Sequence, residues 1–132
     1  MFPTEKQLKL MKAKIRRIID HGHNDERVVL DITDDTDIGE FLILDTTYTS
    51  QGKVSNKVRH PYWFPDKNVK KGDVVVLYTK KGSSSSQGNS NGSTNHFFYW
   101  GLDNNVWNND GDCALLLHID KWEPHKVTII SK

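Results

Sequence analysis

A chain of 132 residues has room for one domain with a single hydrophobic core. Its 18 Lys and Arg residues nearly balance its 17 Asp and Glu residues, so net charge alone predicts no polyanionic partner. No apolar run approaches the roughly 20 residues of a membrane helix, and the N-terminus lacks the continuous apolar region of a secretory signal. We therefore expect no membrane insertion. The expected location is cytoplasmic if Met1 is the native start and extracytoplasmic if a signal peptide has been removed.

The N-terminus predicts a short helical segment, residues 1–11. The hydroxyl of Thr4 can accept a hydrogen bond from the backbone of Gln7, and the Gln7 side chain can accept one from Thr4, which is the capping-box pattern of a helix start. Residues 12–19 fit both an apolar helix face and an edge strand. We expect a strand there, directly after the short helix.

A series of short strands follows along the rest of the chain. The clearest is residues 26–33, where Val28, Leu30 and Ile32 alternate with other residues and define one buried face. Further strands are expected at residues 41–44, 53–60, 74–79, 97–100, 113–119 and 126–130. Short strands joined by turn clusters, with almost no helix, predict an all-β fold, an antiparallel β-sandwich with a short N-terminal helix.

Residues 82–95 interrupt the strand pattern with serine, asparagine and glycine, and up to Asn95 they contain no apolar side chain. Burial cannot repay the entropy of ordering such a segment. We expect a flexible hairpin loop at 82–95, inside a single domain that spans residues 1–132.

From residue 64 onward, three elements precede or form turns that lead into strands: Phe64-Pro65, Val69-Lys70-Lys71-Gly72-Asp73 and Val106-Trp107-Asn108-Asn109-Asp110-Gly111-Asp112. Together with residues 26–33 and 38–45, they resemble the lamin tail domain. Phe41 stands where that family usually has tryptophan, and Thr33 where it has asparagine. The resemblance covers about residues 13–124. It implies an immunoglobulin-like β-sandwich that serves as an accessory or interaction domain.

Residue types that could hold a metal or perform catalysis occur in patterns that favour turns. His21 and His23 flank a glycine, with no second ligand segment for zinc. Oxygen ligands for calcium surround Trp107, but this residue stands where the EF-hand pattern needs a ligand. The serines lie mostly in 82–95, where a nucleophile would lack a positioned base. We therefore predict no catalytic residue, no metal and no cofactor, with an unidentified small hydrolase as the enzymatic alternative.

Basic residues gather in two segments, residues 6–17 and 53–71, and the second segment includes aromatic residues. Lysine and arginine beside aromatic side chains can bind nucleic acid through phosphate contacts and base stacking. The candidate contact residues are Lys12, Lys14, Arg16, Arg17, Lys53, Lys57 and Arg59. Solubility and the protection of exposed strand edges are the preferred explanation of the same lysines.

The sequence thus predicts a non-catalytic binding module of lamin-tail type whose partner is a protein. A nucleic-acid-binding accessory module that uses the basic residues is the alternative, and the oligomeric state is left undefined. Trp107 is expected to anchor the sandwich, because a tryptophan beside a turn and two strands can bury ~150–250 Å².

Overall fold

The computed structural model describes residues 3–108 and 111–129 of the chain. In chain order its elements are α1 (Glu5–Leu10), β1 (Ala13–Ile19), β2 (Arg27–Ile32), β3 (Thr36–Asp37), the 3-10 turn η1 (Ile38–Glu40), β4 (Phe41–Thr47), β5 (Arg59–Trp63), β6 (Asn68–Val69), β7 (Val74–Tyr78), β8 (Ser85–Gly88), β9 (Thr94–Tyr99) and β10 (Asp112–His118). Among these residues, no helix has the length and apolar character needed to cross a membrane.

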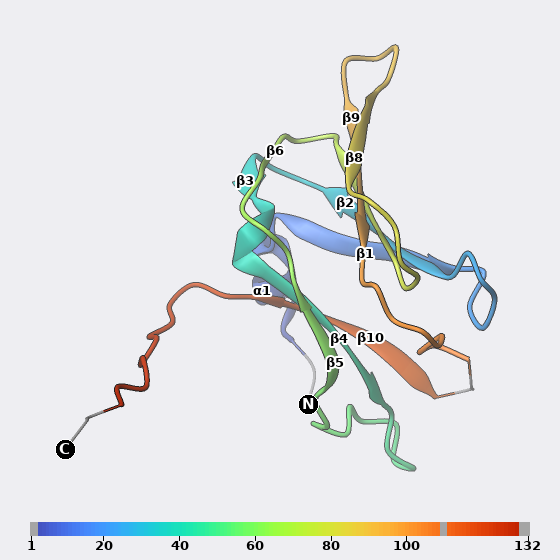
Figure 1. Cartoon of the computed structure of the whole chain (residues 1–132), viewed down its shortest axis with the longest axis vertical. Helices are drawn as coiled ribbons and strands as arrows, with labels where there is room; N and C mark the ends of the chain where they lie inside the picture. Colours follow the sequence, from blue (N-terminus) through green and yellow to red (C-terminus); the bar gives the residue numbers. More distant parts are fainter. Residues whose placement is uncertain (1–2, 109–110, 130–132) are drawn as a thin grey trace.

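The strands form two main sheets that enclose one hydrophobic core (Figure 1). The larger sheet has the order β1-β2-β7-β9-β8, the smaller sheet has the order β10-β4-β5, and β3 pairs with β6. Leu30 and Leu77 of the larger sheet meet Phe41 and Ile43 of the smaller sheet in this core. The prediction of an all-β sandwich with a short N-terminal helix is confirmed.

Local signals in the first part of the chain match the structure closely. Gln7 N donates to Thr4 Oγ1 over 3.2 Å, and Thr4 N donates to Gln7 Oε1 over 2.8 Å, which closes the capping box of α1. β1 begins at Ala13, so the expected strand after the helix is present. In β2, Val28 and Leu30 are buried in the core, as their alternation predicts.

The larger sheet departs from the antiparallel prediction at one position, because β7 and β9 pair in parallel. The chain passes from β7 to β8, on the far side of β9, and then returns into β9 by a short turn. The prediction that residues 82–95 form a loop is therefore wrong for β8 and for the start of β9. The backbone ladder between β8 and β9 needs no apolar side chains, which explains why composition gave no sign of it. The flexibility of this segment stays a prediction.

Two further predicted strands are wrong in whole or in part. Most of residues 53–60 lies outside any strand, and the strand found there is β5, which contains Pro61. β5 tolerates this proline because it is an edge strand, where a missing N–H need not cost a ladder bond. Residues 126–129 pair with no strand in the described part of the chain, and Ile130 lies outside the described residues.

Candidate functional site

The first group of predicted contact residues lies on or just before β1. Arg16 Nε donates to both carboxylate oxygens of Asp31, at 2.9 and 3.1 Å, and Arg16 Nη2 forms a further bond to this carboxylate. Hydrogen bonding to Asp31 raises the pKa of Arg16. Lys12, Lys14 and Arg17 are exposed and have no acidic partner among the described residues. Three of the four residues in this group are therefore available to a ligand.

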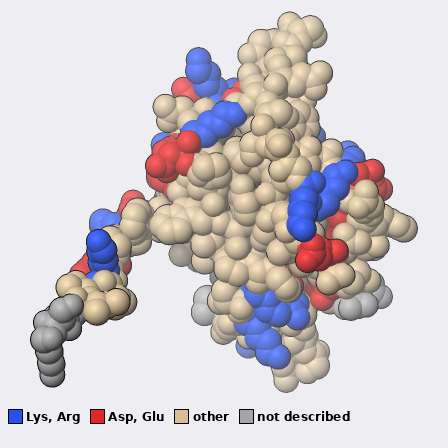
Figure 2. Space-filling model, in the orientation of Figure 1, with Lys and Arg blue, Asp and Glu red and all other residues tan. Residues whose placement is uncertain are grey.

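The second predicted group lies in the connection between β4 and β5 and at the start of β5. Arg59 Nη2 is 3.0 Å from the buried carboxylate of Asp45 and 3.9 Å from Asp112. Lys53 and Lys57 are exposed. On the face shown in Figure 2, Lys and Arg side chains lie in separate groups, several of them against acidic side chains. Arg59, like Arg16, thus forms an ion pair with an acidic residue of the same chain.

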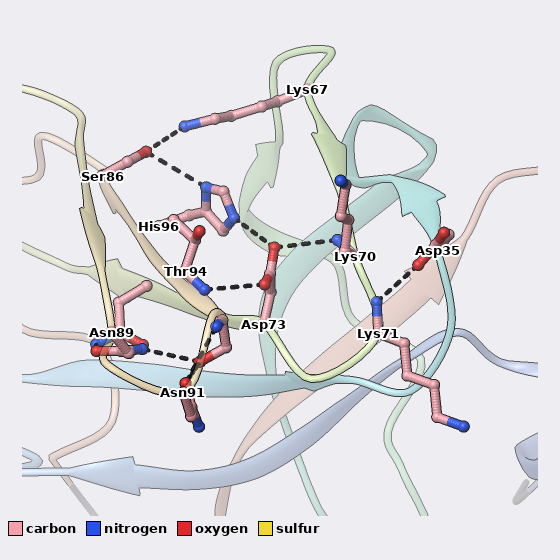
Figure 3. Close-up of polar contacts among 12 residues, drawn as sticks. Asp35, Lys67, Lys70, Lys71, Asp73, Ser86, Asn89, Asn91, Thr94 and His96 are labelled. Atoms are coloured by element: carbon pink, nitrogen blue, oxygen red, sulfur yellow. Dashed lines mark hydrogen bonds and ion pairs between the residues drawn. The ribbon is translucent and has the colours of Figure 1, made fainter.

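A polar network that was not predicted connects β8, β9 and the turn before β7 (Figure 3). Ser86 Oγ lies 2.5 Å from Lys67 Nζ and 3.3 Å from His96 Nδ1. His96 Nε2 lies 2.9 Å from Asp73 Oδ2, and Asp73 also accepts two backbone N–H groups. Burial would raise the pKa of Asp73, but the hydrogen bonds from His96 and the backbone outweigh it and lower the pKa.

Ser86, His96 and Asp73 follow the order of a nucleophile, a base and an orienting carboxylate. The expectation that the serines of 82–95 lack a positioned base is therefore wrong for Ser86. This serine lies on an exposed edge strand, however, and its oxygen is shared with Lys67. Acyl transfer also needs donors aimed at a developing oxyanion in an enclosed site. The arrangement satisfies its own polar groups and ties the β8–β9 hairpin to the turn before β7.

A second buried polar centre is the carboxylate of Glu26, which is 0% exposed. Its Oε1 accepts Thr79 Oγ1 at 2.7 Å and Val106 N at 2.9 Å. Its Oε2 accepts Gly22 N at 2.8 Å and Trp107 N at 3.2 Å. Trp107 itself is 3% exposed and belongs to the core, while its energetic role as an anchor stays a prediction. One carboxylate thus holds three separate chain segments together.

The sequence carried a partial signal for each of these centres. His96 alternates with Phe98 in a strand pattern, which places the histidine on the core face, and a buried histidine needs a polar partner. Glu26 begins the clearest predicted strand. The partners could not be found in the same way, because Asp73 is 23 residues from His96 and Trp107 is 81 residues from Glu26.

The two main sheets have four edge strands, and three of them are protected against strand addition. β1 carries three basic residues and a register shift. β5 contains Pro61 and a register shift, and β8 is a short strand of polar residues and glycine. β10 differs, because it contains no Lys, Arg or Pro and its seven residues pair with β4 without a register shift. In the described main sheets, β10 is the edge strand without such protection.

A cavity of about 820 Å³, called here the β10 cavity, lies between β10, β1 and α1. Leu8, Met11, Ile15 and Leu116 contribute to its walls. Met11, Ile15 and Leu116 pack against the core but are only partly buried. The core is therefore incompletely covered on this side of the sandwich.

The free edge of β10 directs backbone polar groups away from β4. Ile119 N donates to Glu40 O over 2.7 Å just beyond the strand, which fixes which residues of β10 bond to β4. Because bonded and non-bonded pairs alternate in an antiparallel ladder, the N–H and C=O groups of Ala114 and Leu116 point toward the open edge. Both residues also line the β10 cavity.

No known protein-family model and no curated protein sequence matches this chain. The resemblance to the lamin tail domain therefore depends on the motifs of the chain itself. Within residues 3–108 and 111–129, no three or more His, Cys, Asp or Glu side chains form a group that could hold a metal ion.

Proposed function

We propose that this chain is a non-catalytic protein-interaction module of lamin-tail type that binds an extended segment of its partner along the free edge of β10. The main support for this proposal is that β10 is an unprotected edge strand and lies beside a partly apolar cavity of about 820 Å³. Strand addition uses both features, because backbone hydrogen bonds provide affinity and alternate side chains enter the cavity.

The β10 cavity limits the kind of segment that can bind. Side chains of an added strand alternate between the two faces of the sheet. One set would face the apolar wall that contains Met11, Ile15 and Leu116, and the other set would face solvent. A segment in which β-branched apolar residues alternate with polar residues meets both conditions.

The polar network around Ser86 supports a non-catalytic function. Lys67 can donate to Ser86 Oγ, Ser86 can donate to His96 Nδ1, and His96 Nε2 can donate to Asp73. Every group in this row then has a partner, including His96 and Asp73, which are buried and require one. These hydrogen bonds connect β8, β9 and the turn before β7, and no substrate is needed to satisfy them.

The test uses a capped synthetic peptide of alternating valine and threonine with a glutamate at each end. Binding to the edge should slow hydrogen exchange at the amides of Ala114 and Leu116. Ala114→Pro removes an N–H that points toward the open edge and leaves the β4 ladder intact, so this variant should lose peptide binding. Ala114→Val keeps the N–H and is the matched control. Equal binding by the Ala114→Pro and Ala114→Val variants, with both folded by circular dichroism, contradicts the proposal.

Nucleic-acid binding is the second candidate function, and the position of Lys14 favours it. Lys14 lines the same cavity as Val54 and Asn56, which brings both basic segments to one side of the molecule. Phosphate contacts would make the affinity for single-stranded DNA fall steeply with salt. A Lys12→Glu/Lys14→Glu variant should then bind more weakly than the wild type at low salt. Absence of DNA binding by the wild type at low salt contradicts this candidate.

A further inference from the structure

The segment after β10, called here the C-terminal arm (residues 120–129), has the character that the β10 cavity requires. It is exposed at every residue and belongs to no strand. Figure 1 shows it leaving the body of the molecule. Val127 and Ile129 are 81% and 90% exposed, and they alternate with Lys126 and Thr128. The arm therefore offers two β-branched apolar side chains on one side of an extended segment, with nothing in the described chain to cover them.

The beginning of the arm is directed away from the β10 edge of its own chain. Trp122 packs edge-on against Trp63, with ring centroids 5.1 Å apart. Trp63 belongs to β5, which lies at the opposite edge of the smaller sheet from β10. The arm thus runs from β10 toward β5 before it leaves the body of the molecule.

We infer that the arm of one copy of this chain adds as a strand to the β10 edge of a second copy. This inference rests on the proposed function, and it identifies the partner that binds the β10 edge as another copy of the chain. Val127 and Ile129 then face the apolar wall of the β10 cavity, while Lys126 and Thr128 face outward. Exchange of an identical element between two copies is a low-cost route to a symmetric dimer, because each copy supplies one arm and one edge.

The shape of the site favours an arm over direct pairing of two β10 strands. The free edge is flanked by Leu8 of α1 and by Val54 and Asn56 of the β4–β5 connection, all of which line the cavity. A whole sheet that approached edge to edge would meet these side chains. A single extended strand advances about 3.3 Å per residue, so Lys126–Ile129 matches four residues along β10 without bringing a second sheet into the space.

Sedimentation of the full chain over a range of concentrations tests the inference. The wild type should form a dimer with increasing concentration. Val127→Asp/Ile129→Asp removes the apolar side of the arm, and Ala114→Pro removes an edge N–H, so each should weaken dimerisation by roughly 10- to 100-fold. Val58→Asp is the matched control, because Val58 is an exposed apolar residue outside both the arm and the cavity lining. It should dimerise as the wild type does.

A mixture of the arm variant and the edge variant provides a second measurement. The arm variant keeps an intact edge and Ala114→Pro keeps an intact arm, so the mixture should form a heterodimer more readily than either variant forms a homodimer. A wild type that stays monomeric but binds the alternating peptide overturns the arm exchange and leaves the proposed function intact. A monomer in which the amides of Val127 and Ile129 are protected shows docking within one chain and also overturns it. A dimer that survives both variants, in a chain that does not bind the peptide, overturns the inference and the proposed function together.

Discussion

Replacement of Glu26 by glutamine tests whether one buried carboxylate holds the end of the sandwich. The carboxylate accepts four hydrogen bonds, three from backbone N–H groups and one from the hydroxyl of Thr79. Glutamine keeps the size and shape of the side chain but replaces one acceptor oxygen with an NH2 group, which can only donate. If the NH2 group faces Gly22 N and Trp107 N, both of these donors lose their acceptor. If it faces Thr79 and Val106 instead, the Thr79 hydroxyl can accept from it, and only Val106 N–H loses its acceptor.

The expected loss follows from the cost of unsatisfied buried donors. Each buried donor without an acceptor costs about 1–3 kcal/mol. Burial of a neutral amide costs less than burial of a charge, which offsets part of this loss. Because the amide can take the orientation that leaves one donor unsatisfied, we expect Glu26→Gln to lower the free energy of unfolding by about 1–3 kcal/mol, a substantial share of the ~5–15 kcal/mol typical of a domain. Glu26→Ala would remove every acceptor and open a cavity, so the glutamine variant is the more informative one.

Urea unfolding followed by tryptophan fluorescence measures this loss. Glu40→Gln is the matched control, because Glu40 is exposed and, among the described residues, its side chain bonds only to His118, at 3.0 Å. The control should change the free energy of unfolding by less than about 0.5 kcal/mol. Both variants should keep the wild-type dependence on urea concentration. If Glu26→Gln unfolds within about 0.5 kcal/mol of the wild type, the four bonds do not stabilise the fold and the reasoning is refuted.

Three further predictions concern single side chains. Trp107→Ala should lower the free energy of unfolding by roughly 3–5 kcal/mol. Trp107→Phe should cost less, because Trp107 Nε1 has no hydrogen-bond partner among the described residues. Thermal unfolding compares the two variants, and equal losses of stability would contradict the prediction. The lowered pKa of Asp73 stabilises the fold above the ordinary aspartate pKa of ~3.9, and this contribution is lost as the pH falls through the folded value. Asp73→Asn should therefore lose less stability in acid than the wild type, and an unchanged acid limb of the stability curve would count against it. Burial raises the pKa of the Cys113 thiol, so iodoacetamide should modify it more slowly in the folded chain than in urea, a difference that mass spectrometry can detect or exclude.

The parts of the fold that were predictable depend on neighbouring residues in the sequence. The capping box of α1 needs only Thr4 and Gln7, and the buried face of β2 needs only the alternation of Val28, Leu30 and Ile32. The strand β8 is stabilised differently. Its four residues are all exposed, and it is held by the backbone ladder with β9 and by the contacts of Ser86 with Lys67 and His96. Propensity and hydrophobic pattern cannot detect a strand that is held by a backbone ladder and by polar side-chain contacts such as Ser86–His96.

The candidate site was less predictable than the fold, because it depends on which strands are neighbours. The apolar run from Cys113 to Leu117 predicts a strand, but the same run would be ordinary in the centre of a sheet. It becomes a candidate binding edge only because β10 is the edge strand of the smaller sheet and a cavity lies between it and α1. Strand order is set by contacts across the whole chain, so local sequence patterns could not locate this edge.

The C-terminal arm and the β10 edge can be understood together in terms of the cost of leaving each uncovered. Residues 126–129 have a strand pattern, and the prediction of a strand there is wrong for the isolated chain because no neighbouring edge receives it. β10 has the opposite deficit, since backbone N–H groups at its edge point away from β4 and the core beneath it is incompletely covered. Isolated strands are not stable in water, and unprotected edges tend to pair. Contact between the two would cover the apolar side of the arm and the free edge of β10 at once, and the strand pattern of the arm would then correspond to the proposed assembled state.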